Sequence, residues 1–245
     1  MLGGKHFPVA LLLMLSLAAQ AAWAQFGVPW TRSPAVTIVA NGDDPRIGLV
    51  QDAVAFWNGI LTEIGSGFRI GAVARMDRPI PEEALLQASQ SVVGAAGRNR
   101  PPLPDLLDDL PGDLVVFLAN TAFVSFAAPF DAHGRRFVAI RGLQFPPLNL
   151  PNVAPNLVAH EIGHAIGLGH NADPTLLMCG RPAPCRPDAF RSQEPRMFPL
   201  SDDERRDLLG MYPRSWTPIR NRPRRARSAR RVRRAGFARP SAGRE

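Results

Sequence analysis

Residues 160–170 read His-Glu-Ile-Gly-His-Ala-Ile-Gly-Leu-Gly-His. An α-helix turns once every 3.6 residues, so His160 and His164 are expected to project from the same face of one helix. Gly167 follows one turn later and can adopt the positive φ that ends a helix and reverses the chain. The reversal would bring His170 back toward the first two histidines. The spacing therefore predicts three imidazoles that converge on one point.

Three imidazole nitrogens are a ligand set for zinc, and three protein ligands leave a fourth position open, as in catalytic zinc sites. Glu161 neighbours His160, so we expect it beside the metal, where it can act as the general base of a hydrolysis. The alternative is a helix whose histidines serve packing or surface polarity. Chance agreement at five fixed positions is on the order of one in 10⁵, which favours the zinc site.

From His160 to Met178 the sequence resembles the metzincin zinc metallopeptidases and, within them, the matrixins, which suggests a bacterial secreted member. The link from His170 to Met178 has the matrixin length, a proline at the same place and a Leu-Met ending. The resemblance implies that Met178 packs beneath the zinc. It also implies an α+β catalytic domain: a twisted, mostly parallel sheet with an antiparallel edge strand, a long packing helix, the zinc-binding active-site helix and a C-terminal helix.

The activity that this resemblance implies is that of a secreted endopeptidase with one catalytic Zn²⁺ and a polypeptide substrate. One alternative is a secreted protein that keeps the zinc, cleaves no peptide and acts by binding through an arginine-rich C-terminus. The intact Glu161 favours the enzyme over this alternative. A second alternative is another metzincin subgroup, such as the pappalysin-like enzymes, although the short link to Met178 favours a matrixin-like chain.

The sequence departs from the matrixin pattern in several places. The loop 130–134 contains only Asp131 and His133 as candidate ligands of a structural zinc, too few for a tetrahedral site. The resemblance leaves room for calcium, but no calcium ligand set is readable. Cys179 and Gly180 stand where matrixins usually have a tyrosine and a proline that line the specificity pocket. Little chain precedes the first strand, so we expect no prodomain with a zinc-capping cysteine.

The N-terminus has the pattern of a secretory signal peptide, with Lys5, an apolar run over 7–19 and the cleavage signal Ala-Trp-Ala at 22–24. An uncleaved anchor is the alternative, but the apolar run is short for a membrane span. Cleavage near Ala24 predicts export to the periplasm or the medium. Three parts are therefore expected: a signal peptide at 1–24, a catalytic domain at 25–213 and a tail at 214–245.

The chain has two cysteines, Cys179 and Cys185. In an exported protein we expect them to be oxidised to a disulfide. The bridge would close a loop of about seven residues, which stabilises the fold by roughly 2–2.5 kcal/mol in the chain-entropy model. It would brace the wall of the pocket that receives the substrate side chain after the scissile bond. Zinc ligation by the thiols is the alternative, but three histidines already suffice.

The basic character of the protein comes from its C-terminus. Residues 214–245 contain twelve arginines and one acidic residue, whereas the whole chain carries +8, so the remainder is acidic. A segment of this composition is expected to be disordered. It could bind an anionic polymer or a membrane surface, or it could be a solvated extension. We expect a monomer.

Hydrophobic periodicity predicts the remaining elements. Strands are expected at 35–40, 68–73, 113–118 and 137–140. By resemblance the last of these is the antiparallel edge strand, to which an extended substrate could add as a further strand.

Three helices are predicted from caps and apolar spacing. One starts at Asp44, has Trp57 on its core face and stops at Gly65. The active-site helix is expected to start at Asn152 as its cap. The C-terminal helix is expected to begin with a capping box formed by Ser201 and Glu204.

Overall fold

The computed structural model describes residues 28–94, 109–129, 134–180 and 192–219. The predicted signal peptide, Asp131, His133, Cys185 and the tail beyond residue 219 lie outside these ranges. Within them the strands are β1 (Val36–Ala40), β2 (Val73–Asp77), β3 (Leu114–Leu118), β4 (Phe126–Pro129) and β5 (Arg136–Ile140). The helices are α2 (Arg46–Glu63), α3 (Glu82–Gly94), α4 (Val153–Ala165) and α6 (Asp202–Met211).

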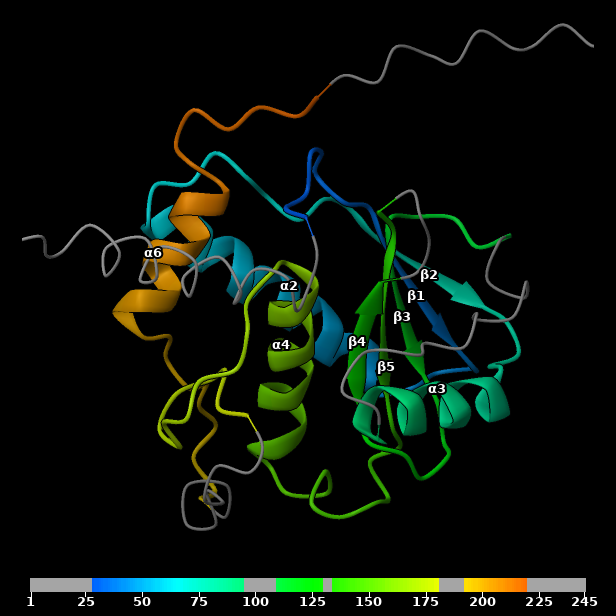
Figure 1. Ribbon diagram of the computed structural model, residues 1–245. Coiled ribbons are helices and arrows are strands. Elements are labelled where there is room, and N and C mark those ends of the chain that lie inside the picture. The colour runs from blue at the N-terminus through cyan, green and yellow to red at the C-terminus, as the bar shows by residue number, and fades with distance from the viewer. Residues whose placement is uncertain (1–27, 95–108, 130–133, 181–191, 220–245) are drawn as a thin grey trace, which may run out of the picture.

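The strands form one sheet in the order β2-β1-β3-β5-β4. Neighbouring strands are parallel except for β4, which pairs with β5 in the antiparallel direction. Helices α2 and α4 cover one face and α3 covers the other (Figure 1). The predicted α+β architecture is confirmed, with a mostly parallel sheet, one antiparallel edge strand, a long packing helix, the active-site helix and a C-terminal helix.

The central strand β3 shows why the sheet needs cover on both faces. All five of its residues are buried and apolar, as expected for a strand inside a parallel sheet. Side chains alternate along a strand, so Leu114, Val116 and Leu118 join the core beneath α2 and α4, whereas Val115 and Phe117 join the core beneath α3. Helix α4 therefore packs on a core to which the central strand contributes.

Helix α2 has the predicted core face and end, but it begins at Arg46 with Pro45 as its N-cap, one residue later than predicted. The Asp44 side chain accepts a hydrogen bond from the Arg46 backbone N–H at 2.9 Å, close to the helix start. Gly65, just after the helix, has a φ of +75°. Trp57 is fully buried, and its indole N–H donates to the Ala159 carbonyl of α4 at 2.8 Å. Trp57 therefore lies in the core, as the apolar stripe predicted, and its hydrogen bond joins the two helices.

The strand predicted at 68–73 is wrong, because β2 begins only at Val73. Phe68 and Ile70 are buried, which explains the apolar signal. The backbone of Ile70 makes its hydrogen bonds with the side chain of Asn58 on α2, as both donor and acceptor. A side-chain amide thus replaces a strand partner in this segment.

The edge strand was also assigned wrongly from the resemblance. The segment predicted as the antiparallel edge is β5, which lies between β3 and β4 and is parallel to β3. Its five buried residues suit an inner strand. The antiparallel edge is β4, a four-residue strand that the sequence pattern did not indicate.

The packed part of the chain continues past the predicted domain end at residue 213. Trp216 packs edge-on against Phe68, with ring centroids 5.0 Å apart, and the Ile219 N–H donates to the Thr31 carbonyl at 2.7 Å. Both contacts join residues beyond 213 to the described part of the chain. Among the described helices, none has the length and apolar character needed to cross a membrane.

Candidate metal centre

The three predicted ligands come together in the structure. The Nε2 atom of His164 lies 3.0 Å from Nε2 of His160 and 2.9 Å from Nε2 of His170, and the other two Nε2 atoms are 3.3 Å apart. Within the described residues this is the one group of at least three His, Cys, Asp or Glu side chains close enough to hold a metal ion. His164 is buried and His170 is exposed, so the cluster opens toward solvent on one side.

Hydrogen bonds to backbone carbonyls orient two of the imidazoles. Nδ1 of His160 lies 2.8 Å from the Leu177 carbonyl, and Nδ1 of His164 lies 2.8 Å from the Leu168 carbonyl. A carbonyl oxygen can only accept, so each Nδ1 carries the proton and each Nε2 keeps its lone pair. Burial, followed by the charges of His160 and His170, holds the pKa of His164 well below its usual value, which keeps that ring neutral.

This arrangement fits a zinc ion. A point equidistant from three atoms with these separations can lie about 2.0–2.1 Å from each of them, which is the Zn–N distance in proteins. Neutral imidazoles that donate their second N–H to a carbonyl are the form in which histidine binds metal. The donor set, its tautomers and its spacing therefore all suit His160, His164 and His170 as zinc ligands.

Glu161 occupies the position next to the first ligand on α4. The residue is buried, with 7% of its surface exposed. It follows His160 directly and precedes His164 by three residues, which puts it beside the two helical ligands. The role of Glu161 as a general base stays a prediction.

The third ligand comes from the turn that Gly167 makes possible. Gly167 has a φ of +115° and its N–H donates to the His164 carbonyl at 3.0 Å. The chain then pairs with the segment after Met178 through hydrogen bonds from Asn171 N–H to the Met178 carbonyl and from Gly180 N–H to the Asn171 carbonyl, each 2.9 Å. The predicted role of Gly167 agrees with this geometry.

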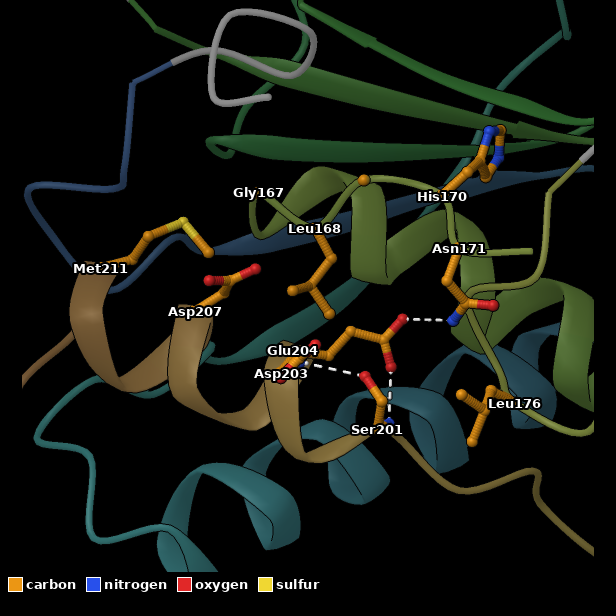
Figure 2. Close-up of a pocket in the computed structure, with 11 residues that line it drawn as sticks. Gly167, Leu168, His170, Asn171, Leu176, Ser201, Asp203, Glu204, Asp207 and Met211 are labelled. Atoms are coloured by element: carbon orange, nitrogen blue, oxygen red, sulfur yellow. Dashed lines mark hydrogen bonds between the residues drawn. The ribbon is translucent and has the colours of Figure 1, made fainter. Parts of the chain in front are cut away.

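The capping box of α6 supports the same loop. The Glu204 carboxylate accepts the Ser201 backbone N–H at 2.7 Å, and the Ser201 hydroxyl accepts the Glu204 N–H at 3.1 Å. Figure 2 shows the second oxygen of Glu204 accepting from the side chain of Asn171, at 2.6 Å. A pocket of about 390 Å³ lies between this loop and α6. Helix α6 therefore holds the residue that follows the third ligand.

Glycines allow the closest approaches at the centre. A Cβ on Gly163, between the two helical ligands, would lie 2.6 Å from the sulfur of Met178 and 2.8 Å from Trp57. A Cβ on Gly180 would lie 2.3 Å from the ring of His170. Met178 itself is fully buried. The methionine thus packs against the active-site helix through a space that only glycine leaves open.

A buried cation holds the C-terminal end of α4. Arg136, 6% exposed, donates to the carbonyls of Ala165 and Val28 and lies over the Trp30 ring at 4.5 Å. The indole N–H of Trp30 also donates to Ala165, at 2.9 Å. Burial raises the pKa of Tyr212, whose phenol therefore stays protonated and donates to the Ile166 carbonyl at 2.7 Å.

At the other end of α4, Asn152 occupies the predicted cap position but makes no side-chain cap hydrogen bond. Its amide instead donates to the carbonyls of Ser192 and Glu194, and its carbonyl oxygen accepts from the Arg196 N–H. Asn156 repeats the pattern one turn later. The predicted cap position is confirmed, but the side chain does not cap the helix, because this fully buried amide binds the backbone of a distant segment.

Sequence reasoning missed Arg136, Asn156 and Gly163. A signal for Asn156 exists, because Asn152, Asn156, His160 and His164 follow one another at four-residue spacing and so share a helix face. Arg136 follows another arginine, Arg135, just before the strand predicted at 137–140, and nothing in the sequence distinguishes the two arginines. The predicted pair Cys179–Cys185 stays a prediction, since Cys185 lies outside the described residues.

No protein-family model and no curated protein matches this sequence. Among solved structures, the chain is similar to archaemetzincin from Methanopyrus kandleri, with a TM-score of 0.40 and 17% identity over 74% of this chain and 96% of that one. It is also similar to a chain in the structure of a chaperone-substrate complex, with a TM-score of 0.40 and 15% identity over 60% of this chain and 28% of that one. These likenesses are too distant to indicate an activity, which has to come from the residues of the site.

Proposed function

We propose that this protein is a secreted, matrixin-like zinc endopeptidase. The observation that carries the proposal is the cluster of three Nε2 atoms, 2.9–3.3 Å apart, whose helical members donate their second N–H to backbone carbonyls. Glu161 directly follows His160 on the same helix. Ligands with a neighbouring carboxylate and one open side suit hydrolysis better than a purely structural metal site.

His160, His164 and His170 would hold the ion. A bound zinc supplies a lower pKa for water and a polarised scissile carbonyl. Glu161 accepts the proton of the attacking water and delivers it to the leaving amine. The carbonyls of Leu177 and Leu168 keep the first two imidazoles in the tautomer and orientation that binding requires.

The sheet supports an extended polypeptide as the substrate. Strand β4 is the last in the strand order and packs beside α4. A peptide that paired with the outer edge of β4 would run alongside the helix that carries Glu161. Backbone pairing of this kind depends little on side chains, so selectivity would come from the altered wall at Cys179 and Gly180.

The location and the other interactions belong to the same proposal and rest on the sequence. The signal peptide pattern supports export after cleavage near Ala24, and export supports a Cys179–Cys185 disulfide. The arginines beyond residue 219 support binding to an anionic polymer or membrane surface by release of counterions.

Zinc content and peptide cleavage together test the proposal. The mature protein should bind one zinc per chain by mass spectrometry and cleave members of a peptide library, and a zinc chelator should abolish the cleavage. Glu161→Gln should keep the zinc and lower the rate by about 10²–10⁴-fold, because it removes the general base. The control is Glu63→Gln, which changes a carboxylate that is 61% exposed on α2 and pairs with Arg205.

Each contrary result has a separate meaning. A protein without zinc would overturn the whole proposal. Zinc binding with no cleavage anywhere in the library would favour a zinc-retaining binding protein. Full activity of Glu161→Gln would keep the enzyme but remove Glu161 as its base.

A further inference from the structure

A closed series of hydrogen bonds links His160 on α4 to Asn156, one turn earlier on the same helix. His160 donates from Nδ1 to the Leu177 carbonyl at 2.8 Å. The N–H of Leu177 donates to the Pro199 carbonyl at 2.9 Å. Phe198, the residue before Pro199, donates its N–H to the side-chain oxygen of Asn156 at 2.7 Å. Asn156 precedes His160 by four residues, so the ring begins and ends on one helix face.

Three residues that make the hydrogen bonds of this ring are buried. Leu177 and Phe198 are 0% and 1% exposed, and Asn156 is 2% exposed. The amide group of Asn156 also donates to the carbonyls of Asn152 and Arg196, each at 2.8 Å. Both sides of its amide are thus occupied, which fixes its rotamer and the position of its oxygen.

We propose that Asn156 is a positioning residue for the zinc ligand His160, acting through Phe198, Pro199 and Leu177. This inference rests on the proposed zinc site. The Leu177 peptide has its N–H and its carbonyl in two different hydrogen bonds. Any shift of Pro199 therefore moves the carbonyl that orients the His160 ring. Asn156 sets the place of Pro199 through the preceding residue.

Asn152 provides a matched control within the same structure. It is also an asparagine of the same helix face, is fully buried, and holds the same extended segment with three hydrogen bonds. The hydrogen bonds of its side chain go to Ser192, Glu194 and Arg196, whereas the side-chain oxygen of Asn156 accepts from Phe198. A purely structural role predicts equal effects for the two asparagines, whereas the positioning role predicts an effect on zinc from Asn156 alone.

The experiment measures metal binding in the full mature protein with Asn156→Ala and Asn152→Ala. Zinc dissociation constants are obtained by competition with a chelator, and the absorption spectrum of the cobalt(II)-substituted protein reports ligand geometry. Groups that orient a metal-bound histidine typically change metal affinity by about 10–100-fold when removed. We expect Asn156→Ala to weaken zinc binding by about tenfold relative to Asn152→Ala and to shift the cobalt bands. The midpoint temperature of thermal unfolding of the metal-free protein should fall by a similar amount for both variants.

A conservative variant guards against failure to fold. A protonated aspartic acid at position 156 can still accept from Phe198 and donate to one carbonyl, so Asn156→Asp should retain tighter zinc binding than Asn156→Ala. Equal zinc affinities and identical cobalt spectra for the two alanine variants would overturn the inference while leaving the zinc site intact. A parent protein that binds no zinc would overturn the inference together with the proposed function. If Asn156→Ala does not fold, Asn156→Asp is compared with Asn152→Asp. Weaker zinc binding and shifted cobalt bands for Asn156→Asp alone support the inference, and equal values for the two variants overturn it.

Discussion

The two ends of α4 are held by different chemistry. At the C-terminal end a buried cation and two aromatic residues bind the carbonyls of Ala165 and Ile166. At the N-terminal end two neutral amides, Asn152 and Asn156, bind the backbone of residues 192–198. The first set supplies hydrogen-bond donors to backbone carbonyls of the helix itself, and the second set forms hydrogen bonds with the backbone of another segment.

This difference follows from what each helix end presents. The last carbonyls of a helix have no partner within it and carry the negative end of the helix dipole, so a cation is favoured there. Arg136 meets both needs, and the sheet supplies it from β5. The amides near the N-terminus satisfy backbone groups that belong to no regular element. We therefore expect changes at the C-terminal end to act mainly on stability and changes at Asn156 to act mainly on zinc.

Arg136→Met should show the largest loss of stability. The variant keeps an apolar stem but removes the donor to the buried Ala165 carbonyl and the cation over Trp30. Removal of hydrogen bonds from a charged donor to buried acceptors costs about 2–3 kcal/mol. Urea unfolding of the metal-free protein measures this free energy.

Arg135→Met is the matched control for this prediction. Arg135 is the preceding residue, is half-buried and donates to the carbonyls of Gly112 and Leu110, away from α4. We expect a loss below about 1.5 kcal/mol for the control. Equal losses for the two variants would contradict the special role given to the C-terminal end of α4.

Gly163→Ala should disturb the middle of the helix, between the two ends. Its new methyl group would lie 2.6 Å from the Met178 sulfur and 2.8 Å from Trp57, so one of these buried groups must move. Overpacking of this kind costs about 1–3 kcal/mol, and zinc affinity should fall because His160 and His164 flank the site. Unfolding and chelator competition measure the two effects.

Gly59→Ala serves as its control on α2. A methyl group there meets nothing within 4 Å, so the exchange should stabilise the helix by about 0.5–1 kcal/mol. A stabilised Gly163→Ala protein with unchanged zinc affinity would mean that Met178 does not pack tightly against the helix.

The convergence of the three histidines could be predicted because it is local. His160, Glu161 and His164 lie within two helical turns, and Gly167 needs only its own backbone freedom to return His170. The capping box of Ser201 and Glu204 is local for the same reason. The apolar character of the sequence also located the buried strands β1 and β3, since the five apolar residues of β3 and the four of β1 fit inner parallel strands.

The setting of the site could not be predicted, because its contacts join distant parts of the chain. Arg136 reaches Ala165, and Asn156 reaches Phe198, across 29 and 42 residues. The failed strand at 68–73 has the same origin, since Ile70 finds its hydrogen-bond partner in the side chain of Asn58. Apolar periodicity indicates which residues are buried, but it does not indicate which polar group forms a hydrogen bond with a given backbone N–H or carbonyl.

Trp30→Phe should have the smallest effect on the free energy of unfolding. It distinguishes the contribution of the Arg136 cation from that of the Trp30 side chain. The phenyl group can still lie beneath the Arg136 guanidinium, and Ala165 still accepts from Arg136 after the indole N–H is lost. One hydrogen bond to an acceptor that keeps another donor is worth about 0.5–1.5 kcal/mol, so we expect a loss near the lower bound. Trp216→Phe, which removes a similar N–H bond to the Trp30 carbonyl at 3.2 Å, is the control in urea unfolding. If Trp30→Phe lost as much free energy of unfolding as Arg136→Met, the aromatic ring and not the cation would hold this end of the helix. The two ends of α4 would then differ in that one is held by aromatic packing and the other by hydrogen bonds.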